Sequence, residues 1–359
     1  MRRIACAVVC LVLSILVLSA SAHALRYTVT DLNVPLGSSY DRIVVSDVNN
    51  SGQVVGWTIA SGTYFEQGWA YKDGTTQVLS MVGYRCEPRG INDSGVIAGS
   101  CLTESSSWRP YLWQDGQMVP LQVPGSASFA EAWALNNNGQ VAGYCQTNYS
   151  FYPCTWDSGG AHTFGTTPSR LNGLADNGTA VGQTLGGNPT RAFVVQNGTT
   201  ALLPSLGGSD SAAYAVNETG MIAGYSATAD GKAHACLWQD GVPHDLGVPV
   251  SKTSVALDVN ESGAVVGYCG PALGTVAANA AFIWLDGVPY SLNDLIPADS
   301  GWGITIPRGI NDEGQIVGTG AHNGKAAAFI LTPEVPEPAG ISALLMGMLA
   351  IGVFRRKRT

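Results

Sequence analysis

The residues able to do acid–base or nucleophilic chemistry are few and widely spaced in this chain of 359 residues. Beyond His23, the histidines are His162, His234, His244 and His322. His234 and His244 fall inside repeated phrases, which favours a structural role. The sequence contains neither a G-x-S-x-G nucleophile motif nor an HExxH zinc motif. We therefore expect no catalytic residue, no cofactor and no enzymatic activity.

Four acidic residues share one position in a repeated turn, directly after the Asn that opens it: Asp93, Glu218, Glu261 and Asp312. This pattern predicts a role in the turn itself. Calcium is the alternative, because turns such as Asn92-Asp93-Ser94-Gly95 offer oxygen ligands. Each loop has at most two carboxylates, however, and calcium takes about 6–8 oxygen ligands. We therefore expect no metal site.

Tryptophan occurs in two patterns. One set recurs at a single repeat position, which indicates core packing between repeats, with sugar stacking as the alternative: Trp69, Trp113, Trp156, Trp238 and Trp284. Trp57, Trp108, Trp133 and Trp302 break that pattern. Trp108 lies in the variable loop 102–109, and Trp302 follows the long loop 296–301. Because binding residues concentrate in such loops, we expect Trp108 and Trp302 to contact a ligand.

These residues belong to a repeat of about 43 residues. An apolar residue, Asn, two polar residues and Gly are followed by an apolar stretch that ends in Gly, first as Val48 to Gly56. A degenerate copy has Ala175 in place of Asn. The central glycines of the seven copies are Gly52, Gly95, Gly139, Gly178, Gly220, Gly263 and Gly314. Such a period with β-type composition is typical of four-stranded propeller blades.

Each repeat is expected to hold four up-and-down strands. The Asn-Gly phrase predicts one hairpin, and Asp-Gly or Asn-Gly pairs such as Asp240-Gly241 predict another. The seventh repeat stops at Leu331 without a fourth strand, and Arg26 to Leu32 has the character of that strand. The sequence therefore predicts an all-β, seven-bladed β-propeller over 25–332, closed by the N-terminal strand. An open β-solenoid or two separate β domains remain the alternatives.

The repeat resembles that of the HAF repeat family of extracellular proteins. The phrases closest to that family are His234-Ala235-Cys236-Leu237-Trp238, Arg191-Ala192-Phe193-Val194 and Leu206-Gly207-Gly208. The resemblance covers roughly Arg26 to Leu331. It implies export and carries over no catalytic residue.

The N-terminus has the layout of a signal peptide. Arg2-Arg3 precedes an apolar run from Ile4 to Leu18, and Ala22-His23-Ala24 fits a cleavage site. We expect residues 1–24 to be removed after Ala24. A permanent N-terminal anchor is the weaker alternative.

The C-terminal segment 333–359 has three parts. A proline-broken motif (Val335, Pro336, Glu337 and Pro338) precedes an apolar run over 339–354 and a basic stop (Arg355, Arg356, Lys357 and Arg358). The run predicts a transmembrane helix that is slightly shorter than the hydrocarbon core is thick. The cations that follow it are expected on the cytoplasmic side. This layout resembles the PEP-CTERM sorting signal of Gram-negative bacteria. That resemblance implies an inner-membrane intermediate, cutting by an exosortase near the motif, and release to the cell surface or outside. An uncut anchor is the alternative.

The charge of the mature chain limits its partners. Without Arg2, Arg3 and the four C-terminal cations, 12 basic residues face 26 acidic ones, a net charge of about −14. An acidic body argues against nucleic acid as a partner, because neutralising phosphates requires Lys and Arg.

Six cysteines remain after signal removal, and an even count in an exported protein predicts disulfide bonds. If Asp93-Ser94 is a hairpin tip, Cys86 faces Cys101. Similar counting places Cys145 opposite Cys154. Cys236 and Cys269 are left over, so they either pair or remain separate buried thiols.

Together these features predict an exported, exosortase-processed and non-enzymatic surface or extracellular-matrix protein with a binding or structural propeller. Its expected partners are the exosortase, the membrane before cleavage, and extracellular polysaccharide or a surface protein. The alternative is a propeller lyase or glycosidase acting on extracellular polysaccharide, which carboxylates converging at the channel mouth would favour. A spacer without a ligand is the third possibility.

Overall fold

A computed structural model describes residues 25–334, apart from 36–39, 61–65, 80–84, 126, 249–252 and 271–279. The expected signal peptide and the sorting tail from Val335 lie outside the described residues, so both stay predictions. Among the described residues, no helix is long and apolar enough to cross a membrane.

Short strands and tight turns make up nearly all of the described chain. The inner strands are β2 (Tyr40–Val48), β6 (Arg85–Ile91), β10 (Phe129–Leu135), β14 (Ser169–Leu174), β18 (Gly207–Val216), β22 (Thr253–Val259) and β26 (Trp302–Ile310). The second strands are β3 (Val54–Ala60), β7 (Ile97–Leu102), β11 (Val141–Thr147), β15 (Ala180–Thr184), β19 (Ile222–Thr228), β23 (Val265–Gly270) and β27 (Ile316–His322). The third strands are β4 (Glu66–Lys72), β8 (Trp108–Gln114), β12 (Ser150–Asp157), β16 (Ala192–Gln196), β20 (Ala233–Gln239), β24 (Ala280–Leu285) and β28 (Lys325–Pro333). The outer strands are β5 (Thr75–Val78), β9 (Gln117–Pro120), β13 (Gly160–Thr163), β17 (Thr199–Leu202), β21 (Val242–Asp245), β25 (Val288–Ser291) and β1 (Tyr27–Asp31). A 3₁₀ turn, η1 (Leu292–Asp294), follows β25.

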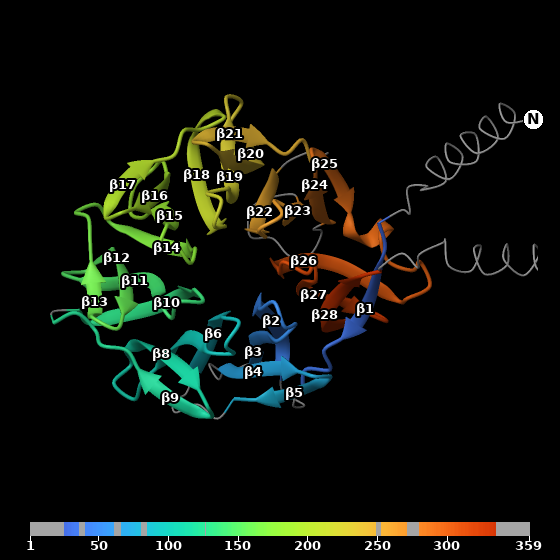
Figure 1. Ribbon diagram of the computed structural model, residues 1–359, viewed down its shortest axis with the longest axis horizontal. Helices are drawn as coiled ribbons and strands as arrows, with labels where there is room; N and C mark the ends of the chain where they lie inside the picture. The colour runs from blue at the N-terminus through green and yellow to red at the C-terminus, as the bar shows by residue number, and fades with distance from the viewer. Residues whose placement is uncertain are drawn as a thin grey trace, which may run out of the picture. The chain divides into compact units, whose positions relative to one another are not determined.

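The strands form a ring of sheets around a central opening (Figure 1). The described strands make five four-stranded sheets and one eight-stranded sheet. The eight-stranded sheet comprises the first two repeats, which are joined by a single parallel bridge between Glu66 of β4 and Arg85 of β6. Each repeat is therefore a four-stranded unit, here called a blade and numbered from β2 onward.

The last blade is completed by the first strand, in the order β1-β28-β27-β26. The Leu32 N–H donates to the Ala328 carbonyl at 3.0 Å, which continues this pairing. The predicted ring closure is confirmed, and the alternatives of an open solenoid or two separate β domains are wrong. Residues Thr28–Thr332 form one compact unit.

The hydrophobic core lies between neighbouring blades. Trp238 of the fifth blade packs with Val181 of the fourth blade and with Ala213. The indole N–H groups of Trp156 and Trp238 donate to the carbonyls of Gln122 and Pro204, each at 2.7 Å. The core interpretation is confirmed for Trp69, Trp156 and Trp238, which are at most 1% exposed. Trp113 and Trp284, at the same repeat position, are half-buried.

The Asn that opens each hairpin joins its blade to the next one. Its amide N–H donates to the carbonyl of the equivalent residue in the following blade, as from Asn49 to Asn92 at 2.9 Å. The same bond runs from Asn92, Asn136, Asn217 and Asn260, and Asn311 closes the circle onto Asn49 at 2.9 Å. Ala175 interrupts it, and Asn172 spans that interface instead, donating to the Ala213 carbonyl at 2.7 Å.

A second circle passes through the residue after this Asn. Its backbone N–H donates to the side chain of the equivalent residue in the next blade, as from Glu218 to Glu261 at 2.9 Å and from Asp312 to Asn50 at 2.9 Å. The remaining members are Asp93, Asn137 and Asp176. These acidic residues were predicted to serve their own turns, but they bond between blades, because each side chain reaches the neighbouring hairpin.

The cysteines follow the predicted register in part. Cys86 and Cys101 face each other on β6 and β7 and form a disulfide, as predicted. Cys145 faces Tyr152 and Cys154 faces Gly143, so the predicted direct opposition of these two cysteines is wrong, and both are buried thiols. Cys236 and Cys269 form no disulfide in the structure either, which agrees with the alternative of separate thiols, although only Cys236 is buried and Cys269 is half-buried.

Candidate ligand-binding site in the central channel

Every inner strand carries an irregularity in its pairing at the same place, three residues before the hairpin Asn. For example, the register of β10 with β11 shifts between Ala132 and Ala134, which leaves Trp133 unpaired. The equivalent residues in the seven blades are Ser46, Arg89, Trp133, Asn172, Tyr214, Leu257 and Arg308. A β-bulge re-aims a side chain, and all seven line the central channel.

The outer part of the channel is a cavity of about 470 Å³. Pockets for small ligands span about 300–1,000 Å³, so this one has the size of a binding site. Its walls add Arg42, Arg170, Trp57 and Tyr268 to the bulged residues. The arginines of the described chain are Arg26, Arg42, Arg85, Arg89, Arg109, Arg170, Arg191 and Arg308, so half of them lie here in an otherwise acidic protein.

Trp133 organises part of this wall. The guanidinium carbons of Arg89 and Arg170 lie 4.4 and 4.5 Å from the centre of its ring system. The two arginines come from the blades on either side of Trp133, so the indole is a shared cation–π partner. Its N–H donates to Glu131 at 2.9 Å, which fixes the orientation of the ring. Arg89 also lies 5.7 Å from the ring centre of Trp57.

The arginines are crowded. Enclosure by protein lowers the pKa of Arg308, and the positive charges of Arg89 and Arg42 lower it further. Water nonetheless reaches the Arg308 side chain inside the channel. Enclosure also raises the pKa of Tyr214 well above its usual range, so this phenol stays protonated. The cavity is thus rich in hydrogen-bond donors and positive charge.

Three carboxylates stand near this wall. Glu87 forms an ion pair with Arg89, and Glu66 forms one with Arg85. Burial raises the pKa of Glu87 to about 7, Arg89 opposes this, and Glu66 and Glu131 add to it. None of the three is among the described residues that line the cavity.

Deeper in the channel, a cavity of about 270 Å³ contains Asp47 and Asp258 beside the bulged residues. The Asp47 oxygens accept the N–H groups of Val48 (2.8 Å) and Ile91 (2.9 Å). Asp258 accepts those of Val259 (2.9 Å) and Ile310 (2.8 Å) in the same way. Enclosure by protein is the main cause that raises the pKa of Asp47 to about 7 and that of Asp258 to about 8.

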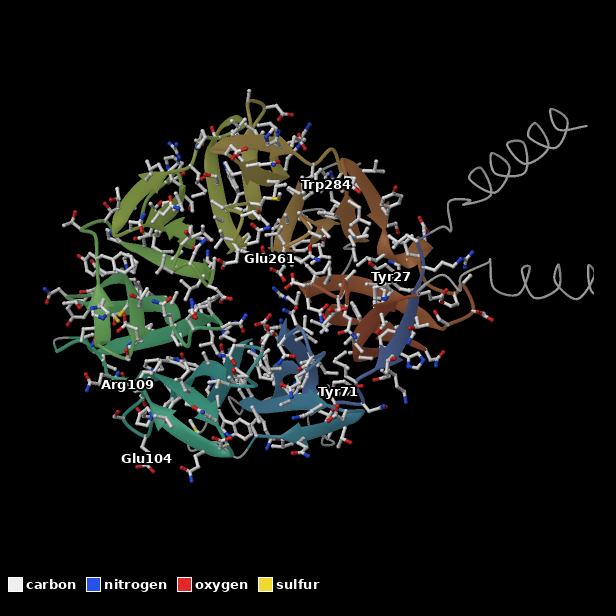
Figure 2. The ribbon with its side chains drawn as sticks, viewed as in Figure 1. Tyr27, Tyr71, Glu104, Arg109, Glu261 and Trp284 are labelled. Carbon is white, nitrogen blue, oxygen red and sulfur yellow. A yellow bond between two sulfur atoms is a disulfide. The ribbon has the colours of Figure 1, made fainter. Side chains whose placement is uncertain are left out.

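The far end of the channel is the hairpin ring, with a cavity of about 240 Å³. Figure 2 shows Glu261 of this ring beside the central opening. The described residues contain no group of three His, Cys, Asp or Glu side chains that could hold a metal ion. The side-chain oxygens of the acidic residues in this ring already accept hydrogen bonds from backbone N–H groups of the neighbouring hairpins, so these residues have a structural role.

The two tryptophans expected to contact a ligand lie elsewhere. The Arg85 guanidinium lies 5.5 Å from the ring centre of Trp108. Trp302 stacks on His322 with ring centres 4.6 Å apart, and His322 bonds Asp31 at 3.0 Å. Both tryptophans are half-buried, and neither is among the described residues that line the channel cavities. His234 pairs with Asp245 at 2.7 Å, consistent with its predicted structural role.

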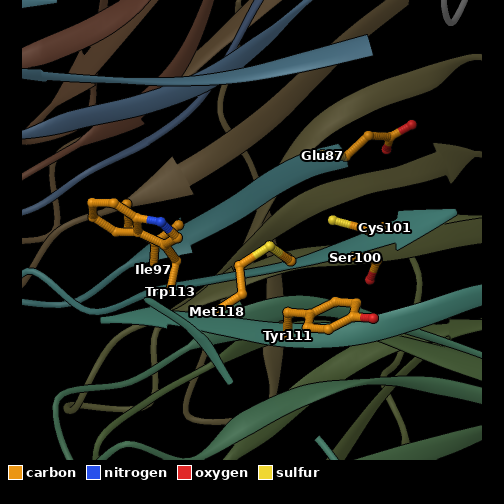
Figure 3. Close-up of a pocket in the computed structure, with 8 residues that line it drawn as sticks. Glu87, Ile97, Ser100, Cys101, Tyr111, Trp113 and Met118 are labelled. Carbon is orange, nitrogen blue, oxygen red and sulfur yellow. The ribbon is translucent and has the colours of Figure 1, made fainter. Parts of the chain in front are cut away.

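A smaller cavity lies inside the second blade, between Glu87, Cys101, Tyr111 and Met118 (Figure 3). Its volume is about 10 Å³, room for about one water molecule. It is a packing void beside the disulfide rather than a ligand site.

Sequence reasoning missed the channel residues. Arg89, Trp133 and Arg308 lie on inner strands, where they interrupt the pattern of hydrophobic residues. A usable signal was present, because all three stand three residues before the hairpin Asn or its equivalent. Aligning the seven repeats on that Asn would have placed them at one depth of the channel.

The ring of four-stranded sheets, its closure by β1 and the lined channel define a β-propeller protein. No family model matches the chain, and no curated protein matches its sequence.

Several solved structures are similar to it. The β-propeller domain of the Trilobed protease from Pyrococcus furiosus aligns with a TM-score of 0.55 and 10% identity, over 82% of this chain and 97% of that one. That domain has an open velcro topology, whereas β1 pairs with β28 here. Ycf48 bound to D1 peptide aligns with a TM-score of 0.50 and 12% identity, over 89% of this chain and 98% of that one. A puromycin-hydrolysing peptidase of Mycobacterium tuberculosis aligns with a TM-score of 0.52 and 11% identity, over 87% of this chain and 56% of that one. These similarities establish the fold alone.

Proposed function

We propose that this protein is an exported, non-enzymatic binding protein of the cell surface or extracellular matrix, which holds its ligand in the outer channel cavity. One observation carries the binding role. The seven bulged positions are structurally equivalent, yet they hold six residue types, whereas the hairpin positions around them repeat. A cavity of this size with several polar groups pointing together has the properties of a binding site, and its varied wall differs from the repeating scaffold around it.

The binding role is tested with the purified protein against a panel of neutral glycans, acidic glycans and peptides, by thermal shift and calorimetry. The test variant is Trp133→Leu, which removes the shared partner of Arg89 and Arg170. Trp302→Leu is the matched control, because Trp302 lies outside the cavity. Binding lost in the first variant and kept in the second supports the site. Binding that depends on Trp302 and not on Trp133 would move the site to the beginning of β26, outside the channel cavity.

Export and processing complete the proposal, and they rest on the sequence of the two ends. The mass of the protein from cells with and without a functional exosortase tests them. A product from about Leu25 to the Val335–Pro338 motif, found only with the protease, is expected. An uncut chain in both strains would make the tail an anchor and place the propeller at the periplasmic face of the membrane.

An enzyme acting on polysaccharide is the second candidate, and Glu87 is the observation that favours it. A carboxyl group with a pKa of about 7 has the property of a general acid. Against this role, Glu87 is bound to Arg89 and is absent from the described lining of the cavity. New reducing ends or unsaturated products after incubation with polysaccharide, abolished by Glu87→Gln, would establish the enzyme and overturn the binding role.

A further inference from the structure

We propose that the ligand of the outer channel cavity is the end of an acidic glycan that carries carboxylates on successive sugar rings. This inference rests on the proposed function and names the chemistry of its ligand. It follows from the charge, the donor content, the distribution and the depth of the cavity.

Charge gives the first argument. Within the described residues, Arg89 has a carboxylate partner, but Arg42, Arg170 and Arg308 have no ion pair. Arg170 is half-buried, whereas Arg42 and Arg308 are exposed to the water of the channel. The charges of Arg89 and Arg42 act unfavourably on that of Arg308. Like charges held close together cost free energy, and an incoming polyanion relieves that cost.

The hydrogen-bonding character of the wall separates a glycan from a peptide. Guanidinium groups dominate the polar lining and can only donate. The Ser46 hydroxyl already donates to the Pro88 carbonyl at 2.7 Å, and the Asn172 side-chain oxygen is a buried acceptor without a partner among the described residues. Acceptors are therefore few in this wall beside four guanidinium groups. A peptide brings an N–H with almost every residue and needs acceptors for them. A uronic acid brings carboxylate, ring and hydroxyl oxygens, which suit a donor-rich wall.

Distribution argues against a compact oxyanion. The four arginines come from β2, β6, β14 and β26, so they enter the cavity from four different blades instead of converging from one. A single phosphate or sulfate in about 470 Å³ would contact only part of this set. Carboxylates on adjacent sugars can engage separate guanidinium forks, each with two parallel hydrogen bonds. Trp57 and Tyr214 also line the cavity.

Depth limits how far such a chain enters. Beyond the arginines lie Asp47 and Asp258, and beyond them the acidic hairpin ring. A polyanion is attracted to the outer cavity and repelled from the inner end. The glycan is therefore held by its end and does not thread the channel.

Calorimetry on the full purified protein tests the inference with three probes: a trigalacturonate, its methyl ester and a triglutamate peptide. The acid is expected to bind, with affinity falling as salt rises. Arg42→Gln and Arg170→Gln should each weaken binding about ten- to a hundredfold, the range of a lost charge-assisted hydrogen bond. Lys325→Gln removes one exposed positive charge outside the cavity and should change affinity less than twofold, taken as about the limit of the measurement.

Each other outcome is decisive. Equal binding of the ester would show that charge is not recognised, and tighter binding of the peptide would replace the glycan by a protein; both overturn the inference and leave the binding role intact. A protein that binds none of the three but binds a neutral glycan through Trp133 has the proposed function without the proposed ligand. If Lys325→Gln weakened binding as much as Arg170→Gln does, affinity would depend on the net charge of the protein and not on the arginines of the cavity, and the inference would be overturned.

Discussion

The Asn circle makes a quantitative prediction at the place where the last blade meets the first. Asn311 is 4% exposed. Its amide N–H groups donate to the Asn49 carbonyl at 2.9 Å and to Gln315 Oε1 at 2.8 Å. Its oxygen accepts the Gln315 backbone N–H at 2.8 Å. Asn311→Ala removes all three bonds and adds no steric conflict.

The expected cost follows from the groups left behind. The Gln315 N–H loses its acceptor, whereas the Asn49 carbonyl keeps the Gly52 N–H at 3.0 Å. One unsatisfied buried polar group costs about 1–3 kcal/mol, so the variant should lose about 2 kcal/mol of stability. For a domain of this size, that corresponds to a fall in Tm of about 3 °C.

Urea unfolding under non-oxidising, non-reducing conditions, followed by tryptophan fluorescence, measures this cost. Asn92→Ala is the matched control, because Asn92 makes the equivalent bonds to the Asn136 carbonyl (3.2 Å) and the Val96 N–H (3.0 Å). If the ring unfolds as one unit, both variants should lose similar amounts, although Asn311 bridges 262 residues. A loss below about 0.5 kcal/mol in Asn311→Ala would refute the reasoning, since it would make the buried bonds energetically neutral. A second transition only in Asn311→Ala would show that the ring opens at this junction.

Three further predictions concern stability. The pKa values of Asp47 (about 7) and Asp258 (about 8) are raised, so the folded protein holds protons that the unfolded chain releases above about pH 4. Stability should therefore fall between about pH 4 and 8, by up to about 1.4 kcal/mol per pH unit for each carboxyl. Denaturation curves of the double variant Asp47→Asn with Asp258→Asn should show a flatter dependence of stability on pH. Gly143→Ala should prevent folding or cost several kcal/mol, because its Cβ would collide with the Glu131 carbonyl, whereas Gly303→Ala, with open space around it, should be tolerated; equal circular dichroism melting curves for the two would contradict this. The double variant Cys86→Ser with Cys101→Ser removes the disulfide between residues 15 positions apart and should lower the stability measured in urea by about 3 kcal/mol. An unchanged midpoint would mean that the unfolded hairpin is equally restricted without the bond.

The fold was predictable from the sequence because its instructions are local. Asp240 and Gly241 adopt φ of 51° and 75°, the turn that an Asp-Gly pair favours between strands. The Gly that ends each repeated phrase, such as Gly143, is required because a backbone carbonyl fills the place of its Cβ. Seven copies of these turn and glycine patterns predict a ring of four-stranded sheets. The fourth strand missing from the seventh repeat indicated that the N-terminal strand closes this ring.

Register and the site depended on features that the residue pattern does not display. The hairpin between β11 and β12 turns at Asn148 and Tyr149, with φ of 50° and 63°. Placing Cys145 opposite Cys154 put this turn one residue later, at Tyr149 and Ser150, which misplaced Cys154 by two. The channel site depends on bulges, each of which rotates one residue out of the alternating pattern. Arg308 and Trp133 therefore could not be assigned to the channel from alternation alone.

The pairing of β1 with β28 also sets an order of events in time. The first strand to be synthesised is completed by the last, about 300 residues later, and the Arg26 carbonyl accepts the N–H of Glu334 at 2.9 Å. Blades can form one after another as the chain emerges, but the earliest strand has to wait, unpaired, for the whole ring. During folding this waiting strand is the part most open to wrong partners, including the same strand of another copy. Delivery of the final blade is thus the step that turns a string of hairpins into a closed molecule.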